Sequence, residues 1–238
     1  MKQIIKTLLL MLAFITQSAY ANAPVVNKDV QTTTSLDSML SEYKKVILSG
    51  DSVKALDFTF PAVFNTSSKE QLIQMIKQQE STGAPKPKIS NITQTATLPI
   101  KKYAKGEYTL VNYEMDMQMN LAQPGKEKEM EEMLKDPKEL ASFQKMMKGM
   151  LSASLGEDAS IEFEKNSFLA NVHQKSKYIA INEDNKGWKI VELSVATSSM
   201  LDKILPKEIF ATYKNQIETL KSKAKSQMET LMNAMNGQ

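Results

Sequence analysis

The chain has 238 residues, of which 24% are charged and 42% are hydrophobic, and its formal net charge is +3. These proportions are ordinary for a globular protein and exclude a fully disordered chain, a collagen and a multi-pass membrane protein. Apart from one histidine, every basic residue is a lysine, so the forked contacts of arginine with phosphate and guanine are missing. With the near-neutral charge balance, this argues against nucleic-acid binding.

The N-terminus has the three-part layout of a secretory signal peptide. Lys2 and Lys6 precede an apolar run over residues 8–15, and small residues follow up to Ala23. We predict cleavage after Ala21, which removes 21 of the 238 residues, leaves 217 and lowers the formal charge to +1. An uncleaved membrane anchor is the alternative, but the apolar run is far shorter than the ~20 residues that span a bilayer.

The chain contains no cysteine. Small exported animal domains are often held together by disulfides, so an exported chain without any must rely on its hydrophobic core. This combination fits a periplasmic or secreted bacterial protein, and we expect that location. No segment after the signal peptide is apolar enough to span a membrane.

Helices are predicted for the first third of the chain. Residues 22–34 are polar and aperiodic, which indicates a flexible leader. Hydrophobic side chains then recur at spacings of three and four up to Ile47, which predicts a helix that ends at Gly50. Asp51 is positioned to cap a second, short helix that ends before Pro61.

A third helix is predicted from two overlapping capping boxes. Either Ser67 pairs with Glu70, or Ser68 pairs with Gln71, and an apolar stripe follows. The period then changes from 3.6 to 2, because residues 88–98 are rich in isoleucine and threonine and predict a strand.

Strict alternation over residues 109–121 predicts a long strand with one buried face and one wet face. The expected buried set is Thr109, Val111, Tyr113, Met115, Met117, Met119 and Leu121. The expected wet set is Leu110, Asn112, Glu114, Asp116, Gln118 and Asn120.

A helical insertion is predicted at 126–154, in two helices of which the second begins at the Asp136–Glu139 cap. Strands resume after Gly156, and residues 178–195 read as a hairpin that turns at Asp184–Gly187. Pro206 opens a last helix. Beyond Lys221 the chain is polar and methionine-rich, and an exposed helix, a partner helix and a frayed end all remain open.

The predicted fold class is therefore α+β, with N-terminal helices packed on a curved, mostly antiparallel sheet. Residues 35–205 form one domain that carries the insertion, and residues 206–238 form a C-terminal helix and tail. No internal repeat and no Pro-rich or Gly-rich linker divides this chain.

Two short motifs stand out, namely the segment from Tyr43 through Leu48–Asp51 to Ala55–Phe58 and the hairpin Asp184–Val191. Both resemble motifs of the nuclear-transport-factor-2-like (SnoaL-like) superfamily. The resemblance covers roughly residues 36–121 and 158–195. It implies a curved sheet that encloses a conical pocket, in a superfamily of isomerases, dehydratases, hydrolases and non-enzymatic binding modules. The insertion and the last helix are extra to that pattern, and either one is able to plug the pocket or cover the sheet.

Enzymes of that superfamily typically place Asp, Tyr or His in the pocket. The residues here that match those types are Tyr43, Asp57, Tyr113 and His173. Each also has a structural interpretation. Tyr113 is equally a core aromatic, Asp57 a solvent residue on a short helix, and His173 a partly exposed residue at a strand end. No two carboxylates are paired at a defined spacing, and Glu114, Asp116, Glu162 and Glu164 are expected on wet strand faces.

No metal site or cofactor is predicted from motifs, because the chain has one histidine and no phosphate loop, dinucleotide motif or nucleophile elbow. Methionine is abundant, with 16 residues. The Met115, Met117 and Met119 series makes Cu(I) binding an alternative, because thioethers are soft ligands. Adaptable core packing is the simpler interpretation.

The leading hypothesis is an exported, non-catalytic binding or envelope-associated protein. Its working surface would be a sheet-lined pocket or apolar face that carries Tyr113, Met115, Met117 and Trp188. The first alternative is a small-molecule enzyme of proton transfer, isomerase- or dehydratase-like, and the second is Cu(I) binding. A small apolar ligand or a protein partner is expected, and a homodimer through the sheet face or the C-terminal helix stays open.

Overall fold

The computed structural model of the chain describes residues 35–65, 68–81, 86–122, 125–155 and 158–236. The predicted signal peptide and leader, residues 1–21 and 22–34, lie outside the described residues.

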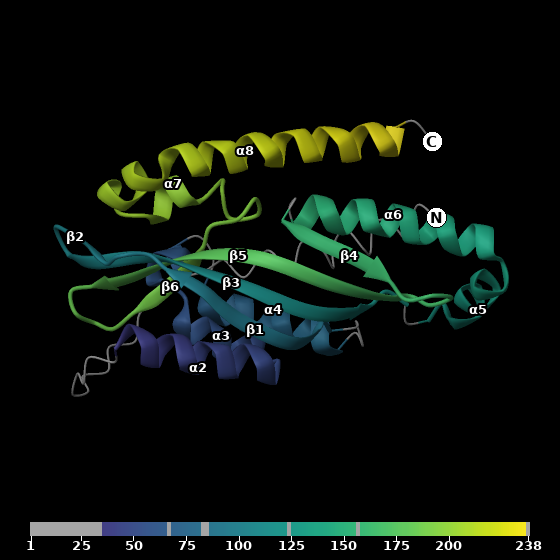
Figure 1. Cartoon of the computed structure of the whole chain (residues 1–238), viewed down its shortest axis with the longest axis horizontal. Helices are drawn as coiled ribbons and strands as arrows, with labels where there is room; N and C mark the ends of the chain where they lie inside the picture. Colours follow the sequence, from purple (N-terminus) through teal and green to yellow (C-terminus); the bar gives the residue numbers. More distant parts are fainter. Residues whose placement is uncertain (1–34, 66–67, 82–85, 123–124, 156–157, 237–238) are drawn as a thin grey trace.

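The fold is α+β, as predicted, with helices on both sides of one six-stranded antiparallel sheet (Figure 1). The N-terminal elements are α2 (Leu36–Ser49), α3 (Ser52–Ala55), η1 (Leu56–Phe58), η2 (Pro61–Asn65) and α4 (Lys69–Ser81). The strands are β1 (Lys88–Thr97), β2 (Lys101–Tyr103), β3 (Gly106–Asn120), β4 (Ala159–Phe163), β5 (Leu169–Glu183) and β6 (Lys189–Glu192). The remaining helices are α5 (Glu127–Lys135), α6 (Pro137–Leu155), α7 (Leu201–Ile204) and α8 (Lys207–Asn236).

Side-chain caps set the ends of the first helices. The Ser35 hydroxyl accepts a hydrogen bond from the Ser38 N–H at the start of α2, and Gly50 ends the helix in the left-handed conformation with φ 70°. The Asp51 carboxylate accepts from the Lys54 N–H and so starts α3 one residue later. The predicted stop and restart at Gly50 and Asp51 are therefore confirmed.

Of the two predicted capping boxes, the Ser68–Gln71 pair forms. The Ser68 N–H donates to the Gln71 side-chain oxygen, and the Gln71 N–H donates to the Ser68 hydroxyl, each at 3.3 Å. Ser67 lies outside the described residues.

The sheet is built around the long pair β3 and β5. Its strand order is β1–β3–β5–β4, with β2 paired to β3 and β6 paired to β5, and all of these pairs are antiparallel. β5 is one continuous strand of 15 residues, because β3 offers it a partner over its whole length. His173 therefore lies in the middle of a strand, and the predicted strand end at this position is wrong.

One end of the β3–β5 pair depends on a glycine. A Cβ atom on Gly106 would lie 2.0 Å from the carbonyl oxygen of Asn182, which is closer than any side chain permits. The predicted hairpin between β5 and β6 is confirmed, and its turn contains Asp184 and Asn185 with φ of 53° and 56°. Such positive φ values are typical of tight hairpin turns.

The alternation along β3 is confirmed on its odd-numbered face, where every side chain from Thr109 to Leu121 is buried. On the other face Asn112, Asp116 and their neighbours are partly exposed, but Leu110 is buried, so its predicted wet position is wrong. The reason is tertiary, because a second hydrophobic core covers this end of the sheet. Its members include Tyr108, Leu110, Ile179, Ile181, Leu201, Ile209, Tyr213 and Ile217.

The C-terminal helix contributes to that second core. α8 runs along the side of the sheet opposite α2 (Figure 1), and its first half packs Ile209, Tyr213 and Ile217 against the strands. The Tyr108 hydroxyl is 2.8 Å from the Thr212 hydroxyl, which ties β3 to the helix. The helical conformation continues beyond Lys221 to Asn236.

The insertion packs on the face of the sheet that carries the odd-numbered side chains of β3, which we call the first face. It lies at the end of the sheet away from the second core. One side of α6 is buried, and Phe143 stacks edge to face on Phe168 with ring centroids 5.3 Å apart. The methionine-rich stripe of residues 140–151 therefore serves as core in this chain. Within the described ranges, no helix combines the length and apolarity that a bilayer crossing needs.

Candidate functional site

A cavity of about 280 Å³ lies between the N-terminal helices and the first face of the sheet. α2 and α3 form one wall, and β3, β5 and β6 form the opposite wall. Its apolar lining consists of Ile47, Ala55, Leu56, Val63, Pro87, Ile89, Met115, Met117, Leu155, Ile190, Val191 and Met200. Its polar lining consists of Tyr43, Ser52, Thr59, Gln174, Ser176, Tyr178, Glu192, Ser194 and Thr197.

Strand register places the polar groups of β5 and β6 together. Directly paired residues of an antiparallel sheet point to the same face. Met115 is paired with Gln174, and Tyr178 is paired with Glu192. Ser176 lies between Gln174 and Tyr178 in the same alternation, so three consecutive inward positions of β5 are polar and lie beside the methionine wall of β3.

The segment after α3 is held against the sheet by a backbone contact. The Phe60 N–H donates to the Ile190 carbonyl at 2.8 Å, next to an isolated parallel bridge between Thr59 and Ile190. This contact fixes the short helices over β6, and it leaves space between Ala55 and the strands rather than a closed layer.

Four aromatic rings gather at one side of the cavity. The ring of Tyr43 lies 5.7 Å from that of Phe58, 6.4 Å from that of Tyr113 and 5.8 Å from that of Tyr178. Tyr113 and Tyr178 are themselves 5.7 Å apart at a nearly perpendicular angle. Tilted and edge-to-face contacts of this kind are the favoured arrangement for aromatic rings. The four rings therefore stabilise one another in this position beside the cavity.

Two hydroxyls in this region form no hydrogen bond of normal geometry among the described residues, although that of Ser176 lies close enough to the Tyr178 hydroxyl to lower the pKa of Tyr178. The Ser176 side chain is 5% exposed and lines the cavity, and the Tyr113 side chain is 1% exposed behind it. Buried polar groups are nearly always paired in folded proteins. A Ser176 hydroxyl without a well-formed hydrogen bond in a cavity wall is therefore a position where a bound molecule gains one.

Glu192 is the one charged side chain among the described residues that line the cavity. Removal from water raises the pKa of its carboxyl group to about 7, although a hydrogen bond from Ser194 opposes the shift. Burial raises the pKa of Tyr113 to about 12 and holds the pKa values of Tyr43 and Tyr178 above the usual tyrosine range. Near neutral pH, Glu192 is thus the group of this site that exchanges protons.

The structure brings some but not all of the seven residues that the sequence singled out to the cavity. Tyr43, Met115 and Met117 line the cavity, and Tyr113 packs against the rings of its wall. Trp188 is buried in the same hydrophobic core but does not line the cavity.

The other two are not brought into the cavity. Asp57 keeps 56% of its side chain exposed and forms an ion pair with Lys69 on α4. His173 projects from the opposite face of the sheet. The structure therefore does not bring Tyr113, Asp57 and His173 together.

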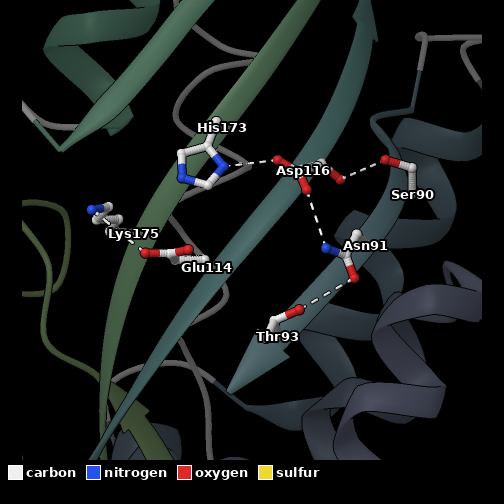
Figure 2. A network of polar contacts seen from close by, with 7 residues as sticks. All are labelled: Ser90, Asn91, Thr93, Glu114, Asp116, His173 and Lys175. Atoms are coloured by element: carbon white, nitrogen blue, oxygen red, sulfur yellow. Dashed lines mark hydrogen bonds and ion pairs between the residues drawn. The ribbon is translucent and has the colours of Figure 1, made fainter. Parts of the chain in front are cut away.

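Figure 2 shows the surroundings of His173 on that opposite face. Its Nδ1 atom is 2.8 Å from the Asp116 carboxylate, which also accepts from the Asn91 amide at 3.2 Å. These hydrogen bonds, that of His173 first, lower the pKa of Asp116. Lys175 and Glu114 form a second, looser pair at 3.5 Å. All of these side chains are partly exposed, which matches a solvated sheet surface held by cross-strand pairs.

Sequence reasoning missed Gln174, Ser176, Tyr178 and Glu192 as a group. Their signal is present in the alternation, since Ala170 and Val172 continue in step into these polar positions on the same face. A run of inward positions that changes from apolar to polar marks a buried polar site. Recognising it requires the register with β3 and β6, which pairs the polar positions with a methionine wall and with Glu192.

Within the described ranges, no group of three or more histidine, aspartate or glutamate side chains is arranged to hold a metal ion. The methionines of β3 are buried in the core, and two of them, Met115 and Met117, also line the cavity.

No family model, curated protein or solved structure matches this chain. Function has to be inferred from the cavity and its chemistry.

Proposed function

We propose that this chain binds a small, largely apolar molecule with one polar end in the cavity between α2, α3 and the sheet. The observation that carries the proposal is the Ser176 hydroxyl, which lacks a well-formed hydrogen bond, in a cavity whose remaining walls are mostly apolar. Such cavities, with a few converging polar groups, are the usual form of small-molecule sites. A volume of 280 Å³ corresponds to about nine water molecules, which suits a compact ligand.

We further propose that the mature chain begins after Ala21 and works outside the bacterial cytoplasm. The three-part N-terminal sequence and the absence of cysteine support this. The order of helices before sheet, with a pocket between them, also supports a divergent member of the nuclear-transport-factor-2-like superfamily. In that case the insertion and α8 are additions to the shared fold.

A proton-transfer enzyme is the second candidate, and one observation favours it. Burial raises the pKa of Glu192 to about 7, which is where a general base works best at neutral pH. The neighbouring Tyr43 and Tyr178 hydroxyls are able to donate to a substrate oxygen. In this version Glu192 replaces Asp57 and His173 as the candidate base.

Cu(I) binding is the third candidate, because Met115 and Met117 present two thioethers to the same cavity. Titration of the mature protein with Cu(I) against a competing chelator tests it. No binding at micromolar Cu(I) would remove this candidate.

The binding function is tested by native mass spectrometry of the protein purified from its own cell envelope. One small molecule bound at one copy per chain is the expected result, and a mixture of two related molecules would instead favour the enzyme. The variant Ala55→Phe, which fills the cavity from α3, should lose the bound mass. Ala211→Phe, on the exposed side of α8, is the matched control and should retain it.

A further inference from the structure

We infer that the cavity selects molecules that carry an ammonium group, which lies between Glu192 and Ser176 while the apolar remainder packs on the methionine wall. This inference rests on the proposed binding function and adds the chemical class of the ligand. It follows from the charge, the hydrogen-bonding groups and the aromatic rings of the site.

The charge of the cavity is the first argument. No lysine and no histidine is found among the described residues that line it, whereas Glu192 is. Lys69 and Lys189 on neighbouring elements contact Asp57, since Lys69 pairs with its carboxylate and Lys189 donates to its carbonyl oxygen. Glu192 takes part in no ion pair within the described part of the chain. Glu192 is half-buried, and a carboxylate that is removed from water is stabilised by a cationic partner, which a ligand is able to supply here.

The hydrogen-bonding groups are the second argument. Tyr178 is the direct cross-strand partner of Glu192, and Ser176 is two residues further along β5, on the same face. Such diagonal positions are roughly 7–8 Å apart at the backbone, which leaves room for one nitrogen atom between the two side chains. An ammonium group has three donors, and the Glu192 carboxylate, the Ser176 hydroxyl and the Gln174 amide oxygen are all able to accept them.

The aromatic rings are the third argument. Tyr43 and Tyr178 border the same space, and their ring centroids are 5.8 Å apart. The faces of aromatic rings attract cations, and the attraction is greater where water is excluded. The same surroundings disfavour an anion. A carboxylate or phosphate ligand would meet Glu192 with no lysine in the wall to offset it.

The titratable groups that face Glu192 are Tyr43 from α2 and Tyr178 from β5, and Tyr113 from β3 packs against the rings of both. All three stay protonated between pH 6 and pH 8, because burial raises their pKa values further. Over this range Glu192 alone changes its charge, and its pKa of about 7 lies in the middle. Ammonium binding requires the ionised carboxylate, so the apparent affinity is expected to fall roughly tenfold from pH 8 to pH 6.

The experiment is calorimetric titration of the full mature protein with three probes of one chain length: hexylamine, hexan-1-ol and hexanoate. At pH 8 hexylamine should bind at least tenfold more tightly than the other two. At pH 6 its affinity should fall about tenfold, with release of close to one proton per bound amine. Glu192→Gln should abolish both the amine preference and its pH dependence, while hexan-1-ol binding remains. Glu162→Gln, at an exposed position of β4, is the matched control and should change neither.

The outcomes separate this inference from the function on which it rests. If hexan-1-ol or hexanoate binds as tightly as hexylamine at pH 8, the ammonium assignment is wrong and the cavity remains a binding site. If the amine binds equally well to Glu192→Gln, it binds elsewhere and the assignment is again wrong. If none of the three probes binds the wild-type protein, both the assignment and the proposed binding function fail.

Discussion

Tyr178 on β5 and Glu192 on β6 are directly paired across two antiparallel strands, so their side chains leave the sheet on the same face and line one cavity. Burial raises the pKa of both groups, that of the Glu192 carboxyl group to about 7 and that of the Tyr178 phenol above its usual alkaline range. The phenol therefore keeps its proton where the carboxyl group titrates. A single pair of β-sheet neighbours thus gives the cavity both a fixed donor and a group whose charge depends on pH.

Replacing Glu192 by glutamine should remove a pH dependence of stability. Burial raises the pKa of this carboxyl group from 4.5 to about 7 in the folded protein. Between these values the folded state holds a proton that the unfolded state has lost, so stability falls as pH rises through the window. From pH 5 to pH 8 this one group should lower the wild-type free energy of unfolding by about 2 kcal/mol.

Urea denaturation of wild type and Glu192→Gln at pH 5 and pH 8 checks this. The free energy of unfolding of Glu192→Gln, relative to that of the wild type, should increase as pH rises. Glu162→Gln should show the same pH dependence as the wild type. Parallel curves for all three proteins would mean that Glu192 is not desolvated.

The hydroxyl groups of two buried tyrosines should respond differently to removal. Tyr113→Phe removes a hydroxyl without a partner in the described structure, and it should be neutral or stabilising by up to about 1 kcal/mol. Tyr108→Phe removes the 2.8 Å contact with Thr212 and should destabilise by about 1 kcal/mol. Thermal denaturation of the two variants provides the comparison. A larger loss for Tyr113→Phe than for Tyr108→Phe would show that the Tyr113 hydroxyl has a partner.

Two glycine-to-alanine substitutions should change the free energy of unfolding in opposite directions. A Cβ on Gly106 meets the Asn182 carbonyl oxygen at 2.0 Å, so Gly106→Ala should separate β3 from β5 and cost more than about 2 kcal/mol. Gly149 lies inside α6 with nothing within 4 Å of an added Cβ, so Gly149→Ala should stabilise by about 0.5–1 kcal/mol. Chemical denaturation measures both. Equal effects would contradict the strand pairing at Gly106.

His173→Asn should raise the pKa of Asp116. The hydrogen bond to His173 is the largest cause of the lowered pKa of this carboxyl group. A lowered pKa stabilises the folded state at pH values above the pKa of the unfolded chain, and this stabilisation is lost as pH falls through the folded-state pKa. The effect of the substitution on stability should therefore be seen at neutral pH. Because both side chains are over 40% exposed, we expect less than about 0.5 kcal/mol.

Titration of the Asp116 carboxyl carbon by NMR measures this shift directly. Lys175→Asn, which alters the neighbouring pair with Glu114, should leave the pKa of Asp116 in place. An unchanged pKa in His173→Asn would mean that Asn91 alone holds the carboxylate.

The sequence by itself determined most of the local secondary structure of this chain, but not the unbroken length of β5. Several features depend only on neighbours within a few residues. They are the end of α2 at Gly50, the start of α3 after Asp51, the alternation of β3 and the turn at Asp184–Gly187. Local hydrogen bonds and side-chain periodicity fix these features, so they are readable in the order of residues. The buried face of β3 followed for the same reason.

Only the tertiary structure decided which faces are covered and which side chains meet. Leu110 is buried because α8 returns over one end of the sheet, and that contact joins residues about 100 positions apart. Glu192, Ser176 and Tyr43 line one cavity because the register of β5 with β6 puts the first two on one face of the sheet and α2 packs over that face. Polar residues in a strand look alike from sequence whether water or a cavity lies beside them, since desolvation comes from segments that are distant along the chain.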